Sequence, residues 1–192
     1  GVDSEIASSV LTGQVAYELT RPLDLYSMWF ARTLALRTAP ALLRAVPQFA
    51  VALLIVPAPY GMLAPTPGGL AAWAAAMLCA VVLSSAITNF MHALILWTVR
   101  GEGVIRFMPA LVMFSSGMVV PMRLLPDWFQ TFARLQPFAG LMDLPSQLFC
   151  GSLAPGNALW IVGTQVFWIA VFVLGGRRLI SSGLRRVTVA GG

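Results

Sequence analysis

Apolar residues in this chain occur in four long runs that are separated by short polar segments. The runs cover about residues 45–64, 70–99, 104–120 and 158–176. A run of about 20 predominantly apolar residues is long enough to cross the hydrocarbon core of a bilayer as a helix. Helices satisfy their own backbone hydrogen bonds in lipid. The pattern therefore predicts an all-α integral membrane protein with about four transmembrane helices.

The segment 121–155 does not fit either a span or a free loop. Proline interrupts it too often for one continuous span, and it is too apolar for a solvated loop. Its pattern predicts two short helices, the first after Pro126 and the second ending near Gly151. We expect a re-entrant helical hairpin on the outer face, since such backbone survives at membrane depth only where protein or a water-filled cavity covers it. Its expected gate residues are Pro121, Pro126, Trp128 and Pro137.

Residues 1–40 are the most polar part of the chain. The stretch 6–19 is amphipathic but too polar to span, and Arg21-Pro22 ends it. The stretch 23–36 mixes aromatic residues with nearby arginines, which is typical of a helix lying in the headgroup layer. We therefore predict a cytoplasmic and interfacial helical segment over 1–40, followed by a transmembrane domain over 41–192.

The arginines set the expected orientation. All twelve basic residues are arginine, and ten of them fall in polar segments that share one side of the predicted bundle. These ten are Arg21, Arg32, Arg37, Arg44, Arg100, Arg106, Arg177, Arg178, Arg185 and Arg186. Arg123 and Arg134 alone fall on the other side. Cytoplasmic segments carry an excess of basic residues, so we expect both ends of this chain in the cytoplasm.

Composition supports a membrane protein and argues against a nucleic-acid partner. Only 10% of the residues are charged and 58% are hydrophobic, whereas soluble domains carry about 25% charged residues. The net charge of +5 comes from arginines at span ends rather than from one basic stripe. Anionic lipid headgroups explain such a distribution, and we expect lipid but no nucleic acid among the partners.

Several catalytic mechanisms are excluded by what the chain lacks. Without lysine it has neither the lysine of a P-loop nor a Schiff-base lysine. One histidine and two distant cysteines do not make an ordinary zinc site, and we expect Cys79 and Cys150 to be free thiols. We therefore predict no metal, no cofactor bound by this chain and no enzymatic activity of its own.

An intramembrane serine hydrolase is the best enzymatic alternative. It would use His92 with Ser84, Ser85 or Ser116. Ser85 and His92 are seven residues apart on one predicted helix, so their mutual reach is poor. The run Phe114-Ser115-Ser116-Gly117 also lacks the first glycine of a Gly-x-Ser-Gly element.

Polar residues gather on one face of the second predicted span. Ser85, Thr88, Asn89 and His92 share that face because three, four and seven residues are helical spacings. They either form hydrogen bonds between helices or line a pathway, to which Ser115 and Ser116 of the third span would contribute. All seven acidic residues lie outside the span cores, which argues against proton coupling. The absence of buried charge favours an apolar or cationic amphiphilic substrate.

Three segments resemble one known family. Gly13-Gln-Val-Ala-Tyr17-Glu-Leu-Thr-Arg21-Pro22-Leu23 resembles the cytoplasmic segment of permease subunits of type-2 ATP-binding-cassette exporters. The order Ser116-Gly117, Pro121, Leu125-Pro126-Asp127-Trp128, Gln136-Pro137-Phe138, Pro145 and Gly151 is similar to the outer-face re-entrant element of that family. Gly191-Gly192 matches the chain end of its bacterial six-span branch.

The resemblance implies a transport function. Two permeases, identical or different, would pair in the bacterial cytoplasmic membrane, and two separate ATPase subunits would drive alternating access and export. The coupling helix would cover about residues 8–19, with Gly13, Tyr17, Glu18, Arg21 and Pro22 as ATPase-coupling residues. ATP would be used by the partner subunit. The six-span branch also implies that two spans precede Gly13, so we expect this chain to be the last two-thirds of a permease. A membrane scaffold or a secondary transporter outside that family is the alternative.

Overall fold

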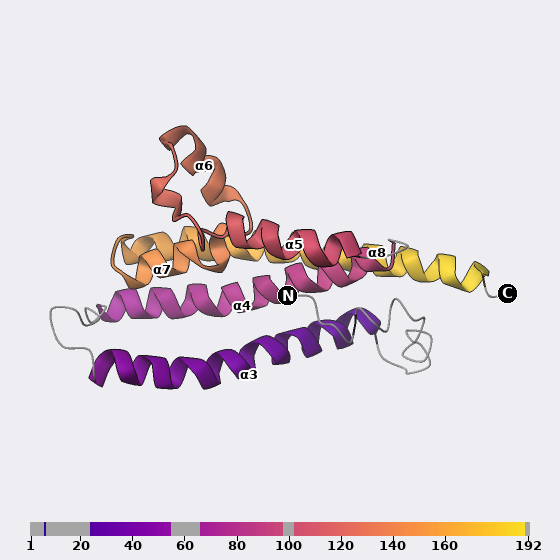
Figure 1. Ribbon diagram of the computed structural model, residues 1–192, viewed down its shortest axis with the longest axis horizontal. Helices are drawn as coiled ribbons and strands as arrows, with labels where there is room; N and C mark the ends of the chain where they lie inside the picture. The colour runs from indigo at the N-terminus through magenta and orange to yellow at the C-terminus, as the bar shows by residue number, and fades with distance from the viewer. Residues whose placement is uncertain (1–5, 7–23, 55–65, 98–101, 191–192) are drawn as a thin grey trace.

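The computed structural model describes residue 6 and residues 24–54, 66–97 and 102–190. Four long helices, α3 (Leu25–Leu54), α4 (Pro67–Ile95), α5 (Glu102–Ser115) and α8 (Ala158–Ala190), run along its longest axis (Figure 1). Two short helices, α6 (Asp127–Leu135) and α7 (Asp143–Phe149), and three 3-10 turns, η1 (Met122–Leu124), η2 (Ala139–Leu141) and η3 (Pro155–Asn157), complete the described chain. No strand occurs in these ranges. The predicted all-α fold is confirmed.

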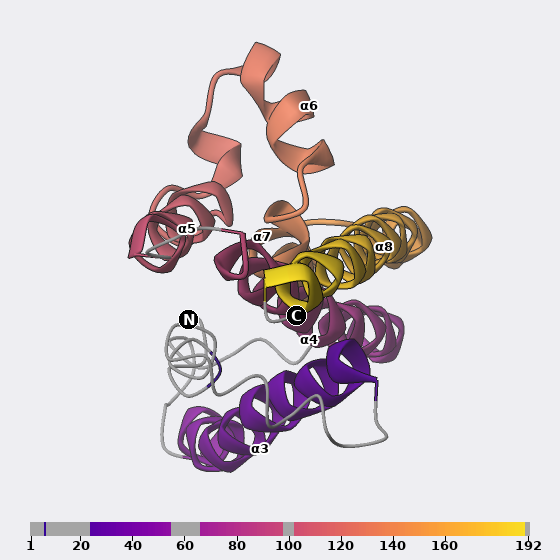
Figure 2. The ribbon, with the colours of Figure 1, turned by 90° about the vertical axis from the view of Figure 1, so that its right-hand side faces the viewer.

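Helix α4 is the centre of the bundle. It packs against α8 and α3, and α7 and α5 also contact it; the view along the bundle in Figure 2 shows α3 and α8 on either side of it. The hydroxyl of Thr66 caps its first turn by accepting a hydrogen bond from the Gly69 amide at 3.1 Å, which Ser and Thr do well at this position. Small buried residues such as Ala72 and Ala76 then let neighbouring elements approach closely.

Helix α3 differs most from the predicted boundaries. It begins at Leu25 and continues to Leu54, across the predicted boundary at residue 40, so the predicted interfacial stretch and the start of the predicted first span form one helix. Pro40 and Pro47 lie inside it, although proline removes an intrahelical hydrogen bond. Buried Tyr26 and Trp29 anchor its first turns against Ala93 and Ile180, and such tertiary packing overrides local propensity.

Two of the described helices have the length and composition of a membrane crossing. They are Pro67–Ile95 and Pro155–Gly183, while Ile105–Ser115 is apolar but shorter. The 14 residues of α5 extend for about 21 Å, less than a hydrocarbon core of about 30 Å. Helix α5 ends five residues before the predicted end of the third span, because Gly117 adopts a left-handed φ of +80°, a conformation that ends helices.

The segment after α5 forms the two predicted short helices. Helix α7 packs against α4, and its buried Leu144 and Leu148 join Ala72, Ala76 and Ile161 in one apolar cluster. Helix α6 instead stands away from the bundle in both views (Figures 1 and 2). Its expected gate residue Trp128 is exposed, as are Pro121 and Pro126, which precede η1 and α6. Pro137 alone among the four expected gate residues is buried.

Candidate functional site

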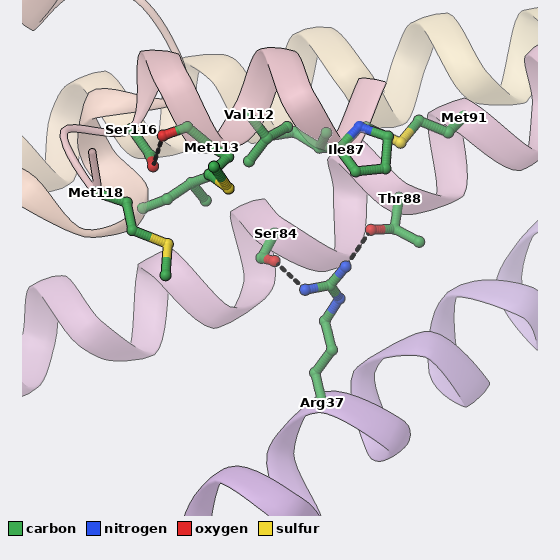
Figure 3. Close-up of a pocket in the computed structure, with 11 residues that line it drawn as sticks. Arg37, Ser84, Ile87, Thr88, Met91, Val112, Met113, Ser116 and Met118 are labelled. Carbon is green, nitrogen blue, oxygen red and sulfur yellow. Dashed lines mark hydrogen bonds between the residues drawn. The ribbon is translucent and has the colours of Figure 1, made fainter. Parts of the chain in front are cut away.

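A cavity of about 270 Å³ lies between α3, α4 and α5. Most of its wall is apolar, and it includes Ile87, Val112 and three methionines, Met91, Met113 and Met118. Arg37 from α3, Ser84 and Thr88 from α4 and Ser116 after α5 supply its polar atoms (Figure 3). A mostly apolar hollow with a few convergent polar groups is the usual form of a small-molecule site.

Arg37 is the polar centre of this cavity. Its side chain crosses from α3 to α4, where the guanidinium donates a hydrogen bond of 2.6 Å to Ser84 Oγ and a second hydrogen bond to Thr88 Oγ1 (Figure 3). Ser84 is 17 residues after the start of α4 and 11 before its end, or about 25 Å and 16 Å along the helix. The guanidinium therefore contacts the middle part of α4.

This position corrects two sequence-based expectations. Arg37 was expected in a polar segment beyond the spans, and the chain was expected to bury no charge. The side chain instead lies half-buried against an apolar helix because α3 is continuous through residue 37 and packs on α4. No carboxylate of the described residues pairs with it. The argument for an apolar or cationic substrate therefore loses its basis.

The predicted polar face of α4 divides between the cavity and helix packing. Thr88 faces the cavity, together with Ser84, which lies one turn before it. Ser85 donates to the Val81 carbonyl of its own helix at 2.9 Å. Asn89 donates to the Tyr26 carbonyl of α3 at 3.3 Å. Thr88 therefore both lines the cavity and accepts a hydrogen bond from α3, whereas Asn89 joins α4 to α3.

His92 also belongs to the packed part of that face. It is fully buried, and its ring meets Trp29 of α3 edge-on at 6.2 Å between ring centroids. Within the described chain the candidate serine nucleophiles have other partners: Ser84 accepts from Arg37, and Ser85 and Ser116 donate to carbonyls of residues three or four positions earlier. The geometry does not support the serine-hydrolase alternative.

The two serines after α5 have different positions. Ser116 is buried and lines the cavity, and its hydroxyl donates to the Met113 carbonyl at 3.4 Å. Ser115 does not line the cavity. Its carbonyl accepts a hydrogen bond of 2.7 Å from the side-chain amide of Gln136, which ties the segment between α6 and η2 to the end of α5.

Two buried contacts near the cavity were not anticipated. The side-chain amide of Gln165 on α8 donates to the carbonyls of Ala76 at 3.0 Å and Gly140 at 2.8 Å. Asp143 of α7 is buried, accepts a 2.6 Å hydrogen bond from Gln147 and lies against the backbone of Gly117.

The role of Ser84 in the cavity could have been predicted from the sequence, since Ser84 is one turn from Thr88 on the same helix. Nothing local marked Arg37 as its partner.

Some predicted residues lie outside the described part of the chain. These are the coupling residues Gly13, Tyr17, Glu18, Arg21 and Pro22.

Across residues 24–54, 66–97 and 102–190, no three His, Cys, Asp or Glu side chains lie close enough together to form a metal site.

Comparison with known protein families gives a match over almost the whole chain. A family model described as "ABC-2 family transporter protein" matches residues 2–191. No curated protein and no solved structure matches the chain.

Proposed function

Because this chain belongs to the ABC-2 transporter family, we propose that it is the permease subunit of an exporter and moves substrate out of the cytoplasm by alternating access. The observation that carries the proposal is the family match, which extends over residues 2–191. Membership makes the chain a membrane component of a transporter and implies an ABC ATPase as its partner.

The cavity between α3, α4 and α5 supports a transport role. Its walls come from three separate helices, so a change in the packing of α3 against α4 would change the shape of the cavity. The second half of α3 leaves more apolar surface uncovered than the first, since Leu42, Leu43 and Val46 are all exposed. Such exposed apolar surface suits lipid or a second permease, and we propose that the transporter contains two.

Energy for transport would come from separate ATPase subunits. The absence of lysine leaves this chain without the residue that contacts the β- and γ-phosphates in a P-loop. ATP would bind to the partners, and their closure would act on the predicted coupling helix that contains Tyr17 and Glu18. This chain would then contribute helices that move in response to the ATPases, rather than catalytic side chains.

The proposed location is the bacterial cytoplasmic membrane, which the chain would cross several times with both of its ends in the cytoplasm. Exposed apolar side chains on α8, among them Leu159, Phe167 and Leu174, suit contact with lipid. The orientation is supported by the arginines of the predicted cytoplasmic segments, apart from Arg37, which lies beside the middle of α4.

The test is reconstitution of the full-length permease with its ATPase. We expect the two to co-purify and to give ATP-dependent transport in proteoliposomes. Tyr17→Ala with Glu18→Ala should weaken ATPase co-purification, whereas the control Glu102→Gln, in another predicted cytoplasmic segment, should not. Unchanged ATPase binding by the double variant would refute the coupling site. An ATPase that never associates with the wild-type chain would refute the permease assignment.

A further inference from the structure

The geometry around Arg37 points to a binding site for the anionic head group of an amphiphile, which we propose to be the exported substrate. The proposal rests on the proposed export function and adds the chemical class of what is exported.

The first argument is the unused donor capacity of Arg37. A guanidinium carries five N–H donors in a rigid planar fork, and Ser84 and Thr88 accept from one terminal nitrogen each. The two hydroxyls hold the plane of the guanidinium in place while most of its donors remain available. A planar fork of this kind binds carboxylate or phosphate oxygens in pairs.

The second argument is charge. Arg37 is half-buried beside the middle of α4, and none of the described carboxylates neutralises it. Ionisable residues inside membrane proteins are rare, and those that occur usually mark the path of a substrate or ion. An anion would supply the missing opposite charge, whereas a cationic head group would be repelled.

The third argument is the apolar remainder of the cavity. Its volume of about 270 Å³ is close to the lower end of the roughly 300–1,000 Å³ found for small-molecule sites, which suits a head group and the first part of an alkyl chain. Met113 and Met118 are 44% and 63% exposed, so the cavity is open on their side and a longer chain could leave there. Methionine adapts to ligands of different shape. A small hydrophilic anion would leave these walls without a partner.

The experiment measures binding before transport. The full-length permease, with its ATPase and without ATP, is placed in nanodiscs of phosphatidylcholine, and binding of dodecyl phosphate and dodecyltrimethylammonium is compared. We expect the wild type to prefer dodecyl phosphate by at least about tenfold. Arg37→Gln should abolish the preference, and Arg37→Lys should retain part of it. The matched control is Arg44→Gln, which removes an exposed arginine from the same helix and should change nothing.

A photoreactive dodecyl phosphate locates the site independently of affinity. Labelled peptides from the wild type should contain Met113 or Met118. Arg37→Gln should lose this labelling while still unfolding in one cooperative transition, at a melting temperature lowered by the loss of its hydrogen bonds to Ser84 and Thr88. Equal affinity for the two amphiphiles, or an Arg37→Gln variant that binds dodecyl phosphate as the wild type does, would overturn the proposal.

Two further measurements are needed. One distinguishes a bilayer lipid from an exported substrate as the source of the anion, and the other distinguishes the binding site from the export function. If phosphatidylglycerol added to the nanodiscs displaces the probe completely, the site belongs to a bilayer lipid and the substrate assignment is wrong. If the probe persists in its presence and ATP drives its export from proteoliposomes, the assignment is supported. Arg37-dependent binding together with a failure of every ATP-driven transport assay would instead count against the export function, while the binding site itself would stand.

Discussion

The guanidinium of Arg37 donates a 2.6 Å hydrogen bond to the hydroxyl of Ser84 and so links α3 to the middle of α4. Thr88 is the second acceptor. The side chains of Ser84 and Thr88 together hold the Arg37 guanidinium at the wall of a largely apolar cavity. The same contact is a packing interaction and a way to orient a binding group. Predictions about packing can be tested by stability measurements, apart from any transport assay.

Removing both hydroxyls should loosen α3 from α4. For Ser84→Ala with Thr88→Val we expect the free energy of unfolding in detergent to fall by about 1–3 kcal/mol, because each lost hydrogen bond contributes about 0.5–1.5 kcal/mol. The control is Thr164→Val, whose hydroxyl bonds only to the Ile161 carbonyl of its own helix. An equal loss of unfolding free energy in the control would show that the contacts of Arg37 stabilise the protein no more than a hydrogen bond within one helix does.

Gly117 should tolerate no side chain. Its φ is +80°, and an added Cβ would lie 2.7 Å from Asp143 Cβ. A left-handed conformation costs an L-residue about 1–2 kcal/mol, and the clash adds to this, so Gly117→Ala should lower the unfolding free energy by more than about 2 kcal/mol.

Two other glycines separate the backbone effect of a left-handed φ from the effect of the steric clash. Gly151 has a φ of +69° but nothing within 4 Å of an added Cβ, so Gly151→Ala should show the backbone effect alone. Gly163 has open space and no positive φ, and Gly163→Ala should be close to neutral. Chemical unfolding of the three variants in one detergent would rank them, and equal effects would contradict the close contact with Asp143.

Gln165 should be needed to hold η2 between α4 and α8. Gln165→Leu removes both donors and leaves the carbonyls of Ala76 and Gly140 without this partner. We expect a loss of about 1–3 kcal/mol of unfolding free energy, the usual effect of leaving a buried polar group unsatisfied. Val166→Leu alters the exposed neighbouring position and should stay within about 0.5 kcal/mol of the wild type. Thermal unfolding of both variants would check this.

Asp24 should make the start of α3 sensitive to acid. The Ser27 hydroxyl donates to its carboxylate at 2.6 Å, and the Ser27 amide does so at 3.1 Å. The hydroxyl contact is the main reason that the pKa of Asp24 lies below its usual value. A lowered pKa in the folded state means that the carboxylate stabilises the fold above its unfolded pKa of about 3.9. That stabilisation is lost as the pH falls through the lower folded value.

The corresponding experiment compares the thermal unfolding of the wild type and of Asp24→Ala, from neutral pH down to a pH at which Asp24 is protonated in the folded protein. Asp24→Ala should destabilise at neutral pH by about 1 kcal/mol, as expected for loss of an N-cap. The difference from the wild type should shrink once Asp24 is protonated. A difference that stays constant down to the lowest pH would contradict the capping role.

Labelling of a native cysteine would test the proposed orientation. Cys150 is exposed and Cys79 is half-buried. In a Cys79→Ser background, a membrane-impermeant maleimide should reach Cys150 from outside intact cells. In a background without native cysteines, Arg178→Cys on α8 should react only after the membrane is permeabilised. The opposite pair of results would reverse the topology.

The sequence by itself determined the class of protein. Long apolar runs with few charges specify helices in lipid because each helix satisfies its own backbone hydrogen bonds. The short helices α6 and α7 follow from short-range signals, Pro126 before the first and Gly151 after the second, so they could be predicted before any packing was known. The end of α5 before Gly117 was not predicted in this way.

Only the tertiary structure decided which polar residues share a site. Ser84 and Ser85 are neighbours in sequence, yet one faces the cavity and the other its own helix, since rotation about the helix axis depends on what packs around α4. Arg37 reaches Ser84 across 47 positions of sequence because α3 is helical through residue 37 and packs on α4. Such a contact depends on the relative placement of two helices, which no local pattern of residues encodes.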